Sequence, residues 1–229
     1  MKKLTCLLAA FLAAFTFAPG LAGTSINNVV MEVDPRGRAT TEITNIGSVP
    51  LGYVLTPFEW TIVDGEDAYA ETRQFMAVPP SFQLAPGQTM TVRVGFRNPT
   101  PARVERTFRL SVREVPTVIA EEGLTFAYNH MLPVYVAPVG GRQPSDVSWR
   151  LVQRGGSWFV RAQNQGNSRA VVRRLVVGGV ELRTNANATI LARSWREYAV
   201  PASAVSGGTA TLQYEFTNGQ SETLTVNRQ

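Results

Sequence analysis

The chain has 229 residues, of which 44% are hydrophobic and 17% charged, and its formal net charge is +5 at pH 7. Lys2 and Lys3 are the only lysines, so every other basic residue is an arginine, and the arginines are scattered along the chain. A dispersed basic charge lacks the electrostatic footprint of a nucleic-acid groove, so we expect no nucleic-acid partner.

The amino terminus has the pattern of a secretory signal peptide. Two lysines precede an apolar run over residues 4–18, and we expect cleavage after Ala22, with residues 1–22 as the signal and the periplasm as the destination. The run has roughly 15 residues, fewer than the roughly 20 that a transmembrane helix needs. Cys6, the only cysteine, lies inside this segment, so we expect neither a disulfide in the mature chain nor an acylated cysteine at the cleavage site.

Short alternating runs separated by turn residues predict an all-β protein from Ile26 onward. Turn chemistry such as that at residues 34–37 and 85–87 separates the runs. Strands at this spacing are typical of a β-sandwich. The first group of expected strands is Val29–Val33, Ala39–Thr44, Leu51–Trp60, Thr89–Phe96, Thr107–Val115 and Leu124–Val136.

A segment rich in proline and glycine, residues 137–145, has the composition of a domain boundary. We therefore expect an N-terminal domain over 23–138, a linker over 139–145 and a smaller C-terminal sandwich over 146–229. Gly-Gly and Asn-Gly pairs between the later runs predict hairpins. The second group of expected strands is Val147–Val152, Trp158–Gln163, Ala170–Val177, Val180–Thr184, Thr209–Phe216 and Glu222–Val226.

The residues that most enzymes and metal sites need are scarce in this chain. His130 is the only histidine, and the expected mature chain has no thiol, so a zinc site of the His/Cys type and a Cys-His nucleophile are excluded. The acidic cluster at Asp64–Asp67 has the sequence of a hairpin loop and lacks the spacing of a calcium loop. We expect no catalytic residues, no metal and no cofactor.

The segment Leu124–Val136 is the most informative part of the chain, because it has no turn signal and no charged residue other than His130. Pro133 cannot donate a ladder hydrogen bond, which favours an edge strand or a bulge. An uncharged edge with large side chains is either covered by the chain itself or pairs with a partner by strand addition. Alternation places on one face Leu124, Phe126, Tyr128, His130, Leu132, Val134 and Val136.

Several motifs across nearly the whole expected mature chain are similar to those of one family. The most specific are Phe82–Arg93, which reads Phe-x-Leu-x-Pro-Gly-Gln-x-x-Thr-Val-Arg, and Arg113–Pro116, which reads Arg-Glu-Val-Pro. On these residues the chain resembles the PapD-like periplasmic chaperones that escort pilus subunits to an outer-membrane usher, in particular the archaic branch. Further matching segments are Thr44–Gly47, Phe58–Trp60, Leu132–Pro138, Val147–Trp149 and Asn164–Asn167.

The resemblance implies two immunoglobulin-like β-sandwich domains in an L-shaped arrangement. It also implies donor-strand complementation, in which the long last strand of the first domain is lent to an incomplete subunit fold. By alignment, the side chains that would fill the subunit's groove are Leu124, Phe126, Tyr128, His130 and Leu132. The implied partners are pilus subunits and an outer-membrane usher, and whether the free chaperone self-associates to cover this strand stays open.

The sequence departs from the family pattern at the site for the subunit's C-terminus. Well-studied members hold that carboxylate with an Arg from the first strand and a Lys from the long strand. Here the first position falls on Val29 or Val30 and the second on Pro133. Arginine can pair with a carboxylate through two hydrogen bonds. The candidate anchors on matching strands are Arg93, Arg109 and Arg113.

Two other classes of protein remain open from the residues alone. A secreted two-domain adhesin or structural surface module would bind through loops, with Asp64–Asp67 as the loop to test. A hydrolase would need His130 in a Ser-His-Asp arrangement, for which no Gly-x-Ser-x-Gly motif is present.

Overall fold

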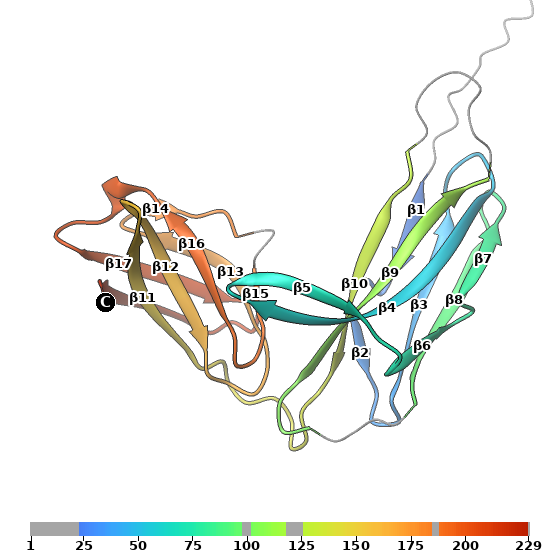
Figure 1. The fold of residues 1–229 in the computed structure, drawn as a ribbon, viewed down its shortest axis with the longest axis horizontal. Helices are drawn as coiled ribbons and strands as arrows, with labels where there is room; N and C mark the ends of the chain where they lie inside the picture. Colours follow the sequence, from blue (N-terminus) through green and yellow to red (C-terminus); the bar gives the residue numbers. More distant parts are fainter. Residues whose placement is uncertain (1–22, 98–101, 118–125, 185–187, 229) are drawn as a thin grey trace, which may run out of the picture.

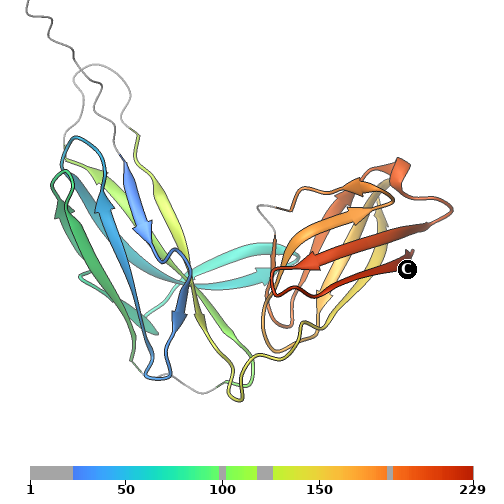
Figure 2. The same ribbon diagram turned by 180° about the vertical axis from the view of Figure 1, so that it is seen from behind.

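The structure is a computed structural model that describes residues 23–97, 102–117, 126–184 and 188–228. Strands β1 to β10 form one β-sandwich and β11 to β18 form a second, and the two meet at an angle that gives an L-shaped outline (Figures 1 and 2). The expected signal segment lies outside the described residues. Within the described ranges, no helix is long and apolar enough to cross a membrane.

The first sandwich consists of two sheets packed face to face. One has the order β1-β3-β8-β6, with bounds β1 (Thr24–Asn27), β3 (Arg38–Asn45), β8 (Thr89–Phe96) and β6 (Phe75–Val78). The other has the order β2-β10-β9-β4-β5, with β7 also paired to β4. Its bounds are β2 (Met31–Val33), β10 (Asn129–Val136), β9 (Arg106–Pro116), β4 (Leu51–Val63), β5 (Glu66–Glu71) and β7 (Ser81–Leu84).

Asn28 is the point at which the chain passes from one sheet to the other. Its φ is 57°, in the left-handed region that Asn tolerates better than most residues. Before it β1 pairs with β3, whereas after it β2 pairs in parallel with β10. The strand expected over Val29–Val33 therefore begins only at Met31, and Val29 and Val30 stay exposed.

The inward-facing residues of these strands form the core of the first sandwich. In β9, Phe108, Leu110 and Val112 are fully buried and alternate with residues of the outer face. Leu132 and Val134 of β10 belong to the same core. Full burial of such a side chain stabilises the fold by about 1.5–3 kcal/mol relative to exposure. The core thus holds the second half of β10 firmly against β9.

The second sandwich is also built from two sheets. One has the order β11-β12-β16, with bounds β11 (Val147–Arg154), β12 (Ser157–Asn164) and β16 (Trp195–Val200). The other has the order β14-β13-β17-β18, with β15 also paired to β13. Its bounds are β13 (Ala170–Val177), β14 (Val180–Glu181), β15 (Thr189–Ile190), β17 (Thr209–Phe216) and β18 (Ser221–Asn227), and a 3-10 turn, η1, spans Ala202–Ala204.

The strand predicted over Leu124–Val136 is shorter in the structure, where β10 begins at Asn129. Leu124 and Thr125 lie outside the described residues, and 126–128 are not assigned to a strand. The register of β10 on β9 places Phe126 opposite Pro116, which has no N–H to donate to a ladder. The prediction was wrong for 126–128, because the pairing of β10 with β9 ends at Asn129 opposite Arg113 and alternation of side chains does not report where pairing ends.

An ion network joins the two sandwiches near the linker. The Glu105 side chain is fully buried, and its Oε2 accepts from Arg169 Nη1 at 2.6 Å and from Arg142 Nε at 2.7 Å. Both arginines also contact Glu32. The Arg169 guanidinium lies 3.5 Å from the centroid of the Tyr135 ring. Arg169 precedes β13, whereas Glu32, Glu105 and Tyr135 belong to the first sandwich, so the network restricts the angle between them.

A second contact joins the β4–β5 hairpin to the other sandwich, which the hairpin reaches in both ribbon views (Figures 1 and 2). Arg196 of β16 is 1% exposed, donates from Nη1 to the Gly65 carbonyl at 3.0 Å, and pairs with Asp67. Trp60 Nε1 donates to Asp67 Oδ1 at 2.7 Å. Gly65 has a φ of 85° and packs so closely on Trp195 that a Cβ would lie 2.5 Å from the ring.

Replacing Arg196 by alanine tests this second contact. The substitution leaves the Asp67 carboxyl group without its cationic partner, so we expect the free energy of unfolding to fall by about 3 kcal/mol. Chemical denaturation of the full chain measures the change. Arg183→Ala, at an exposed arginine of the same sandwich, should alter it by less than about 0.5 kcal/mol. An equally small loss in Arg196→Ala would contradict the role of the pair.

Candidate functional site

The first half of β10 has a strand beside it on one side only within the described residues. β9 pairs with all of β10, from Asn129 opposite Arg113 to Val136 opposite Arg106. β2 pairs with β10 on the other side, but only over Val134–Val136. Backbone groups at 129–133 that point away from β9 have no strand beside them; of these, Pro133 has no N–H, and the Met131 carbonyl accepts from Arg109 Nη1 at 2.9 Å.

The predicted groove-filling residues differ in how the structure places them. The side chains of Phe126 and Tyr128 are exposed, at 64% and 55%, and His130 is half-buried. Leu132 is only 5% exposed and packs in the core of its own sandwich. The expectation that Leu132 offers its side chain to a partner is therefore not met in this structure. Leu124 lies outside the described residues.

Tyr128 is exposed and Leu132 is buried because β10 starts at the open end of the sandwich. Tyr128, His130 and Leu132 project from the same, inward face of the sheet, because alternate residues of a strand share a face. At Leu132 the opposite sheet covers that face, whereas near Tyr128 the covering ends, so the side chain reaches solvent. Val29 and Val30, exposed between β1 and β2, add apolar surface close to this edge.

Glu114 lies at the base of this edge and was not identified from the sequence as a site residue. Its side chain is fully buried. Oε2 accepts from the Tyr128 N–H at 2.9 Å, and Oε1 accepts from the Thr24 hydroxyl and lies 3.5 Å from His130 Nε2. Burial, with the nearby Glu114 charge adding to it, raises the pKa of Tyr53, whose hydroxyl is 3.1 Å from that of Thr24. The alternation of the sequence contains a signal for this residue, because Glu114 occupies the next inward-facing position after three hydrophobic residues.

The structure places two of the three candidate carboxylate anchors on the same face of one strand. Arg109 and Arg113 lie on the outer face of β9, beside β10. The Arg109 guanidinium is 3.8 Å from the centroid of the Trp60 ring, donates from Nη1 to the Met131 carbonyl at 2.9 Å, and leaves its buried Nε without a hydrogen-bond partner in the described chain. Arg113 is exposed beside Asn129.

Arg93 is not part of this site. It lies on β8, in the opposite sheet, and lines a hollow of about 560 Å³ together with Arg38 and Met76. The sequence indicated that Arg93 is on a strand, but strand order alone decides which sheet that strand joins. Arg93 therefore does not lie beside β10 and is removed from the candidate anchors at this edge.

The loop at Asp64–Asp67 makes an interdomain contact, since Asp67 binds Arg196, the Trp60 indole and the Tyr69 hydroxyl. This arrangement gives no support to the alternative of an adhesin that binds through this loop. Within the described residues, no group of three or more His, Cys, Asp and Glu side chains is placed to hold a metal ion.

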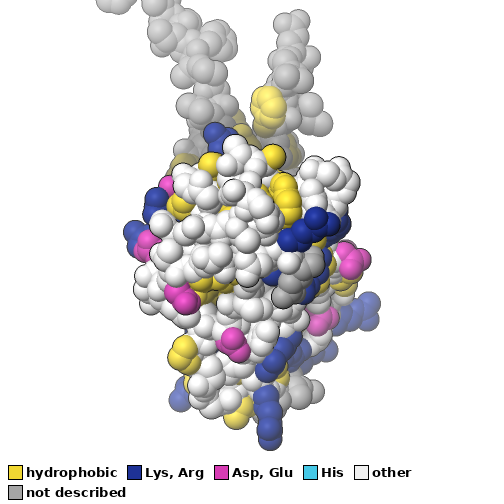
Figure 3. Space-filling view, turned by 90° about the vertical axis from the view of Figure 1, so that its left-hand side faces the viewer, with side chains coloured by type: hydrophobic (Ala, Val, Ile, Leu, Met, Phe, Trp, Pro, Cys, Tyr) yellow, Lys and Arg dark blue, Asp and Glu magenta, His cyan; other side chains and the backbone are white. Residues whose placement is uncertain are grey.

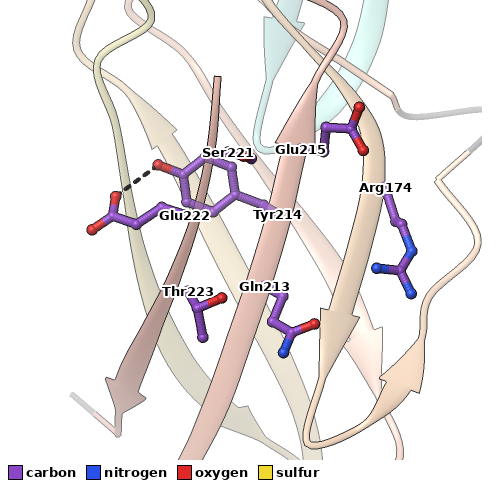
Figure 4. A pocket seen from close by; sticks show the side chains of 7 residues that line it. All are labelled: Arg174, Gln213, Tyr214, Glu215, Ser221, Glu222 and Thr223. Atoms are coloured by element: carbon purple, nitrogen blue, oxygen red, sulfur yellow. Dashed lines mark hydrogen bonds between the residues drawn. The ribbon is translucent and has the colours of Figure 1, made fainter. Parts of the chain in front are cut away.

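A hollow of about 410 Å³ lies on the second sandwich, over the outer face of β13, β17 and β18 (Figure 4). Its lining is polar, and its charged groups are already engaged, with Arg174 paired to Glu181 and Tyr214 donating to Glu222 at 3.0 Å. This end of the molecule carries basic side chains interspersed with acidic ones (Figure 3). The hollow is remote in the fold from the open edge of β10, so we assign it no part in that site.

Tyr214 gives the second sandwich a measurable dependence on alkaline pH. Its burial, and then its hydrogen bond to Glu222 and the charge of that residue, raise its pKa to about 12. Because the neutral phenol is favoured in the folded state, its contribution to stability is complete below the pKa of about 10 of an unfolded tyrosine. We expect this contribution to be lost as the pH rises from about 10 to about 12. The free energy of unfolding, measured by denaturation at several pH values, should fall more steeply with pH in wild type than in Tyr214→Phe over that window. An equal dependence on pH in the two proteins would contradict the assignment.

Residues 27–141 match the family described as "Pili and flagellar-assembly chaperone, PapD N-terminal domain". No curated protein matches the chain at a significant level. The match covers all of β2 to β10, and therefore the open edge, Glu114 and the candidate arginines.

Several solved structures have the same fold as this chain. A chain of the CsuC–CsuE complex, a chaperone–tip adhesion subunit pre-assembly complex from the archaic chaperone-usher Csu pili of Acinetobacter baumannii, has a TM-score of 0.70 and 17% identity, and the match covers 91% of this chain and 100% of that one. A chain of the Salmonella enterica SafA pilin–SafB chaperone complex has a TM-score of 0.67, 14% identity and coverage of 92% and 98%. The Escherichia coli chaperone DraB has a TM-score of 0.61, 19% identity and coverage of 91% and 97%. At these identities, the structures show a shared fold of two immunoglobulin-like domains.

Proposed function

The chain belongs to the PapD-like family of pilus-assembly chaperones, and we propose that it binds, folds and caps pilus subunits by donor-strand complementation, without catalysis. The observation that carries this proposal is the edge of β10 at 129–133, which is open on one side, with the exposed Phe126 and Tyr128 beside it. Such an edge is an aggregation hazard unless a partner strand covers it. A subunit fold that lacks one strand can pair its own edge with β10, which then takes the place of the missing strand.

The chemistry of this binding is that of a β-sheet completed by two chains. Backbone groups at 129–133 would supply ladder hydrogen bonds, and side chains that alternate along the strand would supply specificity. Each large apolar side chain that becomes fully buried stabilises the complex by at most about 1.5–3 kcal/mol. Ordering of side chains and loss of rigid-body freedom offset part of this gain. Phe126, Tyr128 and His130 are the described residues placed for this role, with Leu124 added by the resemblance.

We propose that Arg109, assisted by Arg113, binds the C-terminal carboxylate of the subunit. The stacking of Arg109 on Trp60 and its bond to the Met131 carbonyl fix the guanidinium beside β10. Pro133 lies opposite Arg109 in the register, at the position where the resemblance expects a lysine. An arginine on β9 could thus take the place of the cation that β10 lacks, because guanidinium and carboxylate pair through two hydrogen bonds.

A periplasmic location and delivery to an outer-membrane usher complete the proposed function. The lysines and apolar run of residues 1–18 support export, and the family membership supports a part in pilus assembly. An all-β chain without a disulfide in its mature part would rely on its two buried cores for stability in that compartment.

Acidic substitutions at the exposed aromatic residues test the donor strand. The chain should be co-expressed with the pilus subunit encoded beside it, and the one-to-one complex purified from the soluble fraction. For Phe126→Asp with Tyr128→Asp we expect at least about tenfold less complex, because a carboxylate is costly to bury in an apolar groove. Both positions are exposed in the free chain, so its folding should be unaffected, whereas an acidic residue at the buried Leu132 would disrupt the core.

Val78→Asp is the matched control for this experiment. Val78 is 53% exposed on β6, in the opposite sheet, so one added carboxylate there, against two in the donor-strand variant, should leave the yield of complex as in wild type. An unchanged yield for the Phe126 and Tyr128 variant would contradict donor-strand complementation through this edge.

Arg109→Gln tests the carboxylate anchor. We expect the dissociation constant for the subunit to rise by roughly tenfold to a hundredfold, which is the loss of one charge-assisted, paired hydrogen bond. The increase should disappear when the subunit carries an amidated C-terminus. Neither wild type nor Arg109→Gln then has a carboxylate to bind. Arg93→Gln should have no effect on either subunit. An Arg109 effect that is the same size for both subunits would contradict the assignment.

A further inference from the structure

Glu114 is a carboxyl group at an inward-facing position of β9, on the same face as three hydrophobic residues. Phe108, Leu110 and Val112 are fully buried on the same face, and Glu114 is 2% exposed. Burial of a carboxyl group is costly unless hydrogen bonds satisfy its oxygens. A hydrophobic side chain would avoid that cost, so the hydrogen bonds of Glu114 indicate what the carboxyl group contributes.

These hydrogen bonds are directed at the start of β10. The Tyr128 N–H donates to Glu114 Oε2 at 2.9 Å, and the Glu114 N–H donates to the Tyr128 carbonyl at 2.9 Å. Glu114 thus binds both backbone groups of Tyr128, one residue before β10 begins. The other oxygen, Oε1, accepts from the Thr24 hydroxyl and lies 3.5 Å from His130 Nε2.

Glu114 is itself held from two sides. Thr24 belongs to β1 in the opposite sheet, so its hydroxyl links the carboxyl group across the open end of the sandwich. The hydroxyl of Tyr53, on β4, is 3.1 Å from that of Thr24. The position of the carboxyl group is therefore set by elements that do not belong to the edge it binds.

The contact lies where β10 leaves the sheet. Phe126 falls opposite Pro116 in the register, and a proline provides no N–H for a further ladder bond. Among the described residues, the bonds between Tyr128 and Glu114 are the last that hold the backbone before Phe126. Phe126 and Tyr128 are exposed, so burial contributes little to keeping this segment extended.

We propose that Glu114 is a positioning residue for donor-strand complementation, which holds the start of β10 extended so that Phe126 and Tyr128 are presented before a subunit arrives. This inference rests on the proposed function. A segment that is already extended loses less conformational entropy on binding than a mobile one. The subunit is therefore captured faster and held more tightly by the tethered edge.

Three substitutions separate the effect of the hydrogen bond between the Tyr128 N–H and the Glu114 side chain, here called the tether, from the effect of side-chain packing. Glu114→Gln keeps an acceptor oxygen at the same distance, Glu114→Asp keeps the charge but withdraws the oxygens by one methylene, and Glu114→Leu keeps the volume without any acceptor. Ser111→Ala is the control, because the Ser111 hydroxyl bonds to the Asn129 side chain at 2.6 Å and not to its backbone.

Hydrogen exchange of the free full-length chain measures the tether without any subunit. In Glu114→Asp and Glu114→Leu, the Tyr128 amide should exchange at least about tenfold faster than in wild type, as expected for the loss of one hydrogen bond at a locally opening site. Glu114→Gln and Ser111→Ala should stay within about threefold of wild type at this amide. The Leu110 and Val112 amides report whether the core is intact.

The same variants are then tested for capture of the subunit encoded beside the chain. Association with Glu114→Asp should be about tenfold slower than for wild type while the Leu110 and Val112 amides keep their protection, and Glu114→Gln should restore the wild-type rate. Equal Tyr128 exchange in the Asp and Gln variants would overturn the proposal, even if the Leu variant does not fold. Faster exchange with unchanged capture would overturn it as well. If wild type captures no subunit, the proposed function fails, and the exchange data still decide whether Glu114 holds the edge.

Discussion

Residues 129–133 of β10 are paired with β9 on one side, and in the described chain no strand pairs with them on the other. The unpaired backbone groups must bind water or another strand, because a peptide N–H or C=O that loses its partner in a buried site is costly. The left-handed residue Asn28 is the cause of the opening, since it delays β2 until Met31, where it reaches only the last three residues of β10. One strand is thus fixed at one end by its own core and available at the other.

The features around this edge support its availability. Leu132 and Val134 bury their side chains in the first core and hold β10 in register, while Glu114 binds Tyr128 at the point where burial ends. Arg109 rests on Trp60, and Trp60 also donates to Asp67, the residue that Arg196 of the second sandwich pairs with. The position of the candidate anchor therefore depends on the contact between the two sandwiches.

Alternation predicted the strands well where each strand has a partner along its whole length, as for Thr89–Phe96, Ala170–Val177 and Thr209–Phe216. It failed at 126–128, because the pairing of β10 with β9 ends at Asn129 opposite Arg113. Short strands such as β6, β14 and β15 have too few residues for a periodic pattern. Arg93 was grouped with Arg109 and Arg113 because all three lie on strands, and Glu114 was overlooked because its neighbours along the chain show nothing of Thr24 or Tyr128.

The sequence by itself determined the β class, the two-part organisation and the family, since these depend on local periodicity, turn residues and motifs. Only the tertiary structure decided which side of β10 is open, that Leu132 belongs to the core, and that Arg109 rather than Arg93 lies beside the edge. These outcomes depend on which strands pair and where the pairing stops. That is set by contacts between residues far apart in the chain, which no local pattern records.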